Sequence, residues 1–126
     1  MNTEFESIFA RLRSILEPHA ARLKVTADAP RHYCLEVAFS PKLGKSFPAA
    51  WVKIENAYVS YHFMPVYMFP KLREAMSDKL RARMQGKSCF NFKVSDETLF
   101  KELEEVTAEG FSLCRKAGFA PEHDAV

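Results

Sequence analysis

The feature that most constrains the fold is a change in hydrophobic period near Pro18. Before it, apolar residues recur every three or four positions, which predicts an amphipathic helix over residues 3–17. After it, apolar and polar residues alternate over 23–27 and 33–39, with a turn at 28–31, which predicts two paired strands. A helix followed directly by a strand pair favours an α+β fold over a helical bundle or an all-β sandwich.

A second alternating pair, 50–55 and 58–64, predicts another hairpin that turns at Asn56 and Ala57. A two-residue turn fixes the register of such a hairpin, and with it the face on which each side chain lies. The predicted core-facing pairs are Ile54–Val59, Val52–Tyr61 and Ala50–Phe63, and the pairs on the opposite face are Trp51–His62 and Lys53–Ser60.

The remaining elements are predicted from prolines, glycines and capping residues. We expect a loop at 40–48 and no central strand at 65–70. Short helices are predicted at 71–76 and 78–85, with Ser77 as the cap of the second helix and Gly86 at its end. A strand at 88–93 is followed by a closing helix, which is capped by Ser95 and ends at Gly118 and Phe119 in a Schellman motif. The prediction is one α+β domain over 1–119. It has an N-terminal helix, a four-stranded antiparallel meander, two short helices, a short fifth strand and a C-terminal helix. The helices lie mainly on one sheet face, and 120–126 form a frayed tail.

Composition narrows the kinds of partner. The net charge of +2 over 126 residues gives no strong field for nucleic acid, and no apolar run is long enough to span a membrane. The first residues carry acids where a signal peptide needs basic ones. Three widely spaced cysteines predict a reducing, cytoplasmic location. A membrane partner is not expected, nucleic acid is disfavoured, and homodimerisation through edge strands is left open.

The polar face of the predicted sheet is the first candidate site. Strand alternation places on it the candidate ligand-binding residues Trp51, Lys53, His62, Ser60, Cys34 and Glu36, together with His32. An imidazole, a carboxylate, an ammonium and an indole in one groove could bind a small anionic or aromatic ligand. The alternative is an ordinary half-exposed sheet face that carries polar residues without a ligand.

Other motifs carry weaker signals. His32 and Cys34 point the same way on a strand, but no further metal ligand lies at a telling distance. The segment Gly86-Lys87-Ser88 lacks the upstream glycine and the strand–loop–helix order of a phosphate loop. Residues 71–87 carry six basic side chains and the closing helix is acidic, patterns that are usually solvated helix faces. Cys89 and Cys114 are expected to be packed thiols.

Two segments, Tyr58-Val-Ser-Tyr-His-Phe-Met-Pro-Val-Tyr67 and Arg83-Met-Gln-Gly-Lys-Ser-Cys-Phe-Asn-Phe-Lys93, resemble a group of small bacterial domains of unknown function allied to the YdhG-like domains. Some YdhG-like proteins are described as frataxin-like iron chaperones. The resemblance implies iron binding on an acidic ridge, and the residues that could form such a ridge here are Glu102, Glu105 and Glu109.

Three functions are compatible with these patterns. The first is a non-enzymatic domain that binds a small ligand or a partner protein on the polar sheet face. The second is a frataxin-like iron-binding chaperone that uses the acidic closing helix. The third is a small enzyme in which His62 or His32 acts as an acid or base. No catalytic residue is assigned from the sequence, and whether the protein uses a cofactor is left open.

Overall fold

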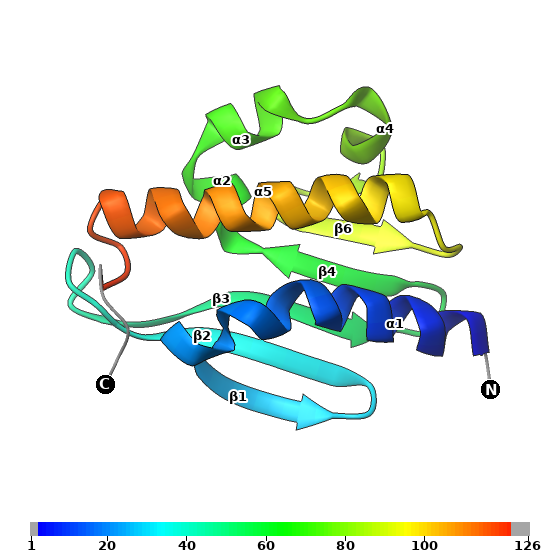
Figure 1. The fold of residues 1–126 in the computed structure, drawn as a ribbon, viewed down its shortest axis with the longest axis horizontal. Coiled ribbons are helices and arrows are strands. Elements are labelled where there is room, and N and C mark those ends of the chain that lie inside the picture. The colour runs from blue at the N-terminus through cyan, green and yellow to red at the C-terminus, as the bar shows by residue number, and fades with distance from the viewer. Residues whose placement is uncertain (1–2, 122–126) are drawn as a thin grey trace.

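A six-stranded antiparallel sheet and two long helices that cover one of its faces make up the fold (Figure 1). The structure is a computed structural model, and it describes residues 3–121. The long helices are α1 (Thr3–Leu16) and α5 (Glu97–Lys116). The strands are β1 (Lys24–Ala29), β2 (His32–Ser40), β3 (Lys45–Ile54), β4 (Val59–Phe63), β5 (Met84–Gln85) and β6 (Cys89–Phe92), in the spatial order β1-β2-β3-β4-β6-β5. The short helices are the 3-10 segment η1 (Glu17–Arg22), α2 (Met64–Met68), α3 (Pro70–Ala75) and α4 (Asp78–Arg81).

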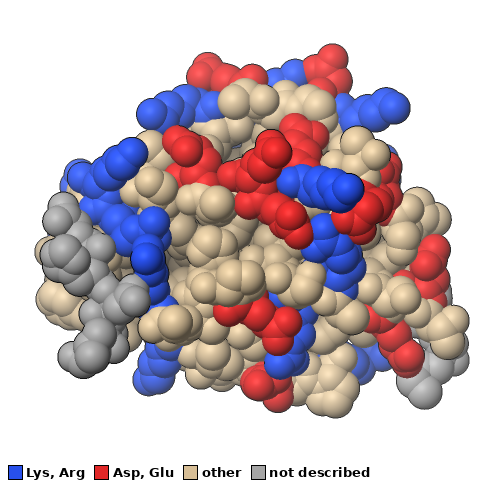
Figure 2. All heavy atoms as spheres, in the orientation of Figure 1, with Lys and Arg blue, Asp and Glu red and all other residues tan. Residues whose placement is uncertain are grey.

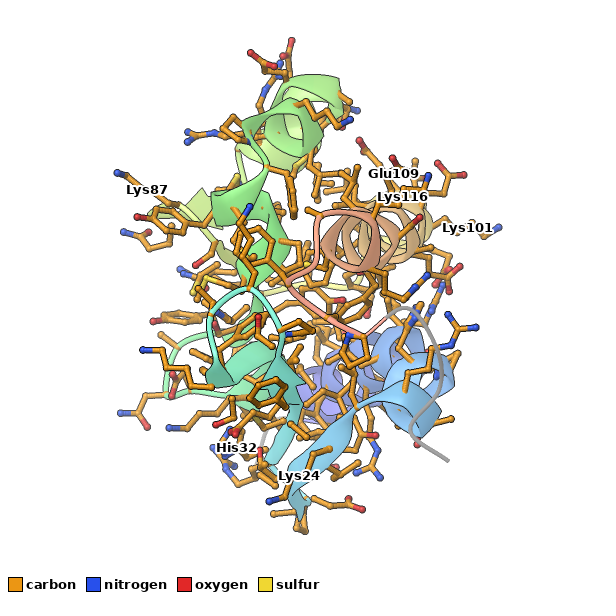
Figure 3. The ribbon with its side chains drawn as sticks, turned by 90° about the vertical axis from the view of Figure 1, so that its left-hand side faces the viewer. Lys24, His32, Lys87, Lys101, Glu109 and Lys116 are labelled. Atoms are coloured by element: carbon orange, nitrogen blue, oxygen red, sulfur yellow. The ribbon has the colours of Figure 1, made fainter. Side chains whose placement is uncertain are left out.

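The α+β class is therefore confirmed, with its N-terminal helix, antiparallel sheet and C-terminal helix. The predicted four-stranded meander with a fifth strand is corrected to a sheet of six strands. Figure 3 shows α5 and α1 on one side of the sheet, and among residues 3–121 no long helix lies on the opposite side. The sheet thus has one face in the core and one face open.

The core lies between the two long helices and the covered sheet face. The apolar stripe of α1 buries Ile8, Leu12 and Leu16 completely, and α1 contacts β3, β4 and α5. From the sheet, Tyr61 and Phe90 are also fully buried. Burying one such side chain stabilises the fold by about 1.5–3 kcal/mol, so this layer is the main source of stability.

The second hairpin has the predicted register. Val52 pairs with Tyr61, Trp51 with His62 and Lys53 with Ser60. The amide of Glu55 donates to the carbonyl of Tyr58 at 2.8 Å, which closes the turn. The period-two pattern and the turn length were sufficient to fix which side chains reach the open face.

The predicted loop at 40–48 is wrong over its second half, because β3 begins at Lys45. Proline was expected to exclude a strand there. The strand pairing shifts register at this point, since Leu35 pairs with Ala50 and Glu36 with Pro48. A bulge is one of the places where a sheet tolerates proline, and buried Phe47 anchors the strand beyond it.

The predicted helix at 78–85 is also too long. It ends at Arg81, and Met84 and Gln85 instead pair with Phe90 and Cys89 of β6. Gly86, which has a positive φ of 81°, lies in the turn between β5 and β6 and is not a helix C-cap. The structure of residues 84 and 85 is therefore decided by pairing with the open edge of β6 and not by the helical spacing of this basic segment.

Helix ends follow the capping rules with one correction. Ser77 caps α4 as predicted, since its hydroxyl accepts from the amide of Leu80 at 3.1 Å. The cap of α5 is Asp96 and not Ser95, because the Asp96 carboxylate accepts from the Leu99 amide at 3.2 Å.

The predicted Schellman motif at the C-terminal end of α5 is confirmed. The amide of Phe119 donates to the carbonyl of Cys114 at 2.9 Å, and Gly118 has a positive φ of 84°. Ala120, predicted to begin a frayed tail, is buried, and residues 122–126 of that tail lie outside the described residues.

A buried hydrogen bond ties β4 to α5, and we expect it to be measurable by a double-mutant cycle. The hydroxyls of Tyr61 and Thr107 lie 2.6 Å apart, and both residues are fully buried. Thr107→Val should lower the free energy of unfolding by about 1–3 kcal/mol because the phenol loses its partner. Tyr61→Phe should cost less, since a helical threonine can bond to its own preceding turn. In urea unfolding, the double variant should cost less than the two single costs added together. Additive costs would show that the pair is not coupled.

Candidate functional site

The open sheet face carries two cross-strand rows of polar and aromatic residues. On β2 and β4, Tyr33 and Tyr61 face the helices, because Tyr33 lies under Arg13 of α1 at 4.3 Å and Tyr61 bonds to α5. Their neighbours in each strand therefore point the other way. One row is Cys34, Trp51, His62 and Cys89, and the other is His32, Lys53, Ser60 and Asn91.

Trp51 covers His62 on this face. The two rings are stacked with centroids 3.7 Å apart and planes inclined by 12°. The stacked indole accounts for the low exposure of His62, which is only 5% although the residue lies on the open face. A tryptophan on a polar sheet face usually covers another group, and here it covers an imidazole.

The His62 imidazole is held from one side by two half-buried groups. Its Nδ1 lies 3.1 Å from the hydroxyl of Ser88 and 3.4 Å from the thiol of Cys89. Its Nε2 is buried and has no hydrogen-bond partner. Burial lowers the pKa of His62 to about 4, so the ring is neutral at physiological pH.

The neighbouring thiol is not activated. Burial raises the pKa of Cys89, an effect that hydrogen bonds from Ser88 and Ser60 only partly offset. A nucleophilic cysteine needs its thiolate, and a histidine that serves as an acid or base works best with a pKa near the operating pH. The His62–Cys89 pair has neither property. Cys114 is a packed thiol, since burial raises its pKa to about 11.

A shallow hollow of about 350 Å³ lies beside the Trp51 indole on the open face. Its walls are His32, Cys34, Pro48, Trp51, Lys53 and Glu55. His62 occupies one face of the indole, and Cys34 is the register partner of Trp51 on the opposite side. The hollow therefore borders the indole face that points toward β2. In Figure 3, His32 lies on the sheet, away from α5.

The hollow carries little net charge. The Lys53 ammonium lies 3.8 Å from the carboxylate of Glu55, and both side chains are partly exposed. Such a pair contributes little to stability but neutralises the ammonium locally. The chemistry offered to a ligand is therefore an aromatic surface with a polar rim.

Most of the predicted ligand-binding residues lie together. Trp51, Lys53 and Cys34 line the hollow, while His62 and Ser60 lie beside it, both buried. Glu36 is the register partner of Pro48, which lines the hollow, but Glu36 is not itself among the lining residues.

Sequence reasoning missed four residues of this site: Ser88, Cys89, Pro48 and Glu55. Ser88 and Cys89 belong to it because β6 pairs with β4, which brings together segments far apart in the chain. The alternation of Cys89 and Asn91 with Phe90 and Phe92 carried a signal for their outward direction. Nothing in the sequence identified β4 as the neighbour of β6.

The acidic residues proposed for iron do not form a clear metal centre. Glu102 accepts hydrogen bonds from the amide and hydroxyl of Ser77, at 2.7 and 2.6 Å, and so caps the segment before α4. Within residues 3–121 no group of three histidine, cysteine, aspartate or glutamate side chains could hold a metal ion. Figure 2 shows acidic and basic side chains intermixed over the helix-covered face. Glu105 and Glu109 lie exposed on α5, and iron binding stays a prediction.

Comparisons with known proteins add no identity. No protein-family model, no curated protein and no solved structure matches this chain. The resemblance to the YdhG-like domains therefore stays a prediction. Among the helices formed by residues 3–121, none has the length and apolar character needed to cross a bilayer.

Proposed function

We propose that this protein is a non-enzymatic binding domain whose open sheet face binds a small planar aromatic ligand against Trp51. The observation that carries the proposal is the position of the indole, which is stacked on His62 through one face and borders a hollow with the other. A ring stacked in the hollow would extend an aromatic pair already in place. Offset or parallel ring pairs contribute about 0.5–1.5 kcal/mol beyond the area that they bury.

The size and charge of the hollow select the ligand class. A volume of about 350 Å³ is at the small end of ligand pockets and suits one or two fused rings. Because Lys53 is paired with Glu55, an aromatic ligand is favoured over a simple anion. Polar groups on the ligand can bond to His32 and to the Lys53–Glu55 pair at the rim. The same hollow could accept an aromatic side chain of a partner protein.

Tryptophan fluorescence gives a direct test, because Trp51 is the one tryptophan in the sequence. We expect at least one member of a library of fused-ring heterocycles to change the Trp51 emission saturably. Native mass spectrometry of the freshly purified protein should show any copurifying ligand. If the whole library leaves the emission unchanged and only the bare chain mass is seen, the hollow is not a small-ligand site.

Variants then locate the ligand. Trp51→Leu keeps an apolar cover over His62 but removes the ring face, so ligand-observed NMR should show binding weakened by about tenfold. The matched control is Phe39→Leu, which changes a 55% exposed aromatic residue of β2 that does not line the hollow. Binding should be unchanged in that variant. Equal loss in both variants, or no loss in Trp51→Leu, would contradict the assignment.

A further inference from the structure

A second surface, at the β5–β6 edge of the sheet, gathers three basic side chains: Lys79, Arg83 and Lys93. Two hollows lie there, of about 320 and 470 Å³, and both are lined by Arg83 and Lys93. Lys79 of α4 lines the first hollow. All three side chains are exposed, and within residues 3–121 none of them forms a salt bridge.

Some basic side chains elsewhere on the surface are paired with carboxylates. Arg11 pairs with Glu97 and Glu104, and Arg81, only two residues before Arg83, pairs with Asp78. Asp96, whose carboxylate accepts from the Leu99 amide as the cap of α5, brings one negative charge to the first hollow, against the three basic side chains. Three like charges near one another repel, and a bound anion would relieve that repulsion.

The backbone holds the two shared cations in place. The amide of Asn91 donates to the carbonyl of Arg83 at 2.8 Å, which joins the chain before β5 to β6. Lys93 directly follows the end of β6. Arg83 and Lys93 therefore project from a paired sheet edge and form a ridge between the two hollows. Arginine binds phosphate oxygens bidentately, and lysine adds a point charge.

The larger hollow has the groups that a planar polar ring needs. It is lined by Tyr58, whose phenol ring is half-buried, and by Gln85 and Asn91. Each amide side chain both donates and accepts hydrogen bonds, as the edge of a nucleobase requires. An aromatic side chain beside cations is the usual combination for binding a base next to its phosphate. The turn between β3 and β4 brings Tyr58 to this surface, so the combination does not appear in the sequence around Arg83.

We propose that the Arg83–Lys93 ridge binds the phosphate of a nucleotide, with its base in the hollow beside Tyr58. Lys79 approaches the phosphate from the other hollow. This site is separate from the hollow at Trp51. The shared chemistry is a phosphate ester attached to a nucleobase, and its source is either a free nucleotide or single-stranded nucleic acid.

The test is calorimetric titration of the full chain with AMP, UMP, adenosine, inorganic phosphate and a short single-stranded oligonucleotide. We expect at least one monophosphate to bind saturably, more tightly than inorganic phosphate and about tenfold or more tightly than adenosine. Tighter binding of the oligonucleotide than of the monophosphates would identify nucleic acid as the source, and equal binding would identify free nucleotide. No saturable binding by any nucleotide, or equal affinity for adenosine and AMP, would overturn the proposal.

Variants distinguish nucleotide binding at this surface from a general attraction of anions to basic side chains. Arg83→Gln with Lys93→Gln should weaken nucleotide binding by about tenfold or more. Lys101→Gln, an exposed lysine of α5 labelled in Figure 3, makes the same kind of charge change elsewhere and should have no effect. Tyr58→Leu should weaken AMP but not inorganic phosphate. Nucleotide binding of unchanged strength in the double variant would exclude the ridge. Any response of the Trp51 emission to nucleotide should be the same in the double variant as in the native protein, because it would report the separate hollow.

Discussion

Gly110→Ala should destabilise the protein by about 2 kcal/mol, although alanine is the better helix former by about 1 kcal/mol. Gly110 lies in the middle of α5 and is buried. A Cβ atom at this position would lie 2.6 Å from Cζ of Phe63 and 2.9 Å from Cβ of Pro65, and it would also meet Cε2 of Phe63. Overpacking of this kind costs about 1–3 kcal/mol and sometimes more.

The Phe63 ring has little room to move away. It is fully buried and packs edge-on against Phe111 of α5, with the ring centroids 5.1 Å apart. The helix must therefore shift away from β4 and α2. Gly110 thus sets how closely α5 approaches the sheet, and through it the depth of the core on that side.

Urea unfolding measures this effect, and two variants control for its cause. Phe63→Leu removes the clashing edge of the ring, so Gly110→Ala combined with Phe63→Leu should cost clearly less than the two single changes added together. Ala108→Gly, at an exposed position of α5, should show the ordinary helix preference by costing about 1 kcal/mol. A stabilised Gly110→Ala protein would mean that α5 does not approach Phe63 this closely.

The sequence was most informative where structure is decided locally. The alternation in residues 50–64 and the two-residue turn gave the register of β3 with β4, and with it the placement of Trp51 beside His62. Side-chain direction in a hairpin depends on period and turn length, both of which can be read from a single sequence. The stack itself could not be predicted, because alternation places two side chains on one face without fixing their rotamers.

Prediction failed where pairing between distant segments overrode local preference. The residues at 84 and 85 continue a segment with helical spacing, but they form β5 because β6 offers an open edge. Pro48 was predicted to lie in a loop, whereas a bulge accommodates it within β3. Ser88 and Cys89 joined the site only through the pairing of β6 with β4, and the ridge at Arg83 gained its aromatic neighbour only through the β3–β4 turn. Both candidate sites thus depend on contacts between segments that no short motif connects.

The free energy of unfolding should fall by up to about 3 kcal/mol as the pH is lowered from about 6.5 to 4, through His62. Burial lowers the pKa of this histidine to about 4 in the folded protein, whereas an exposed histidine in the unfolded chain titrates near 6.5. Between these values the unfolded chain binds a proton that the folded protein does not, so acid favours unfolding. The contribution of His62 to the free energy of unfolding is fully present above about pH 6.5 and is lost at about pH 4. The figure is an upper one, because the Trp51 indole would partly stabilise an imidazolium.

His62→Phe isolates this contribution. Phenylalanine keeps a ring under Trp51 and removes the buried Nε2 that has no partner, while the half-buried Ser88 and Cys89 can turn to water. Stability should therefore fall less steeply with acid in the variant than in the native protein. Burial, with Arg115 and Arg22, also lowers the pKa of His19. The pH dependence that His19 contributes is the same in both proteins, so it cancels when their stability profiles are compared. NMR titration of the His62 ring gives an independent value. A midpoint near 6.5, or identical pH profiles for the two proteins, would mean that the indole does not shield the imidazole from water, and the stack that supports the proposed ligand site would then be absent in solution.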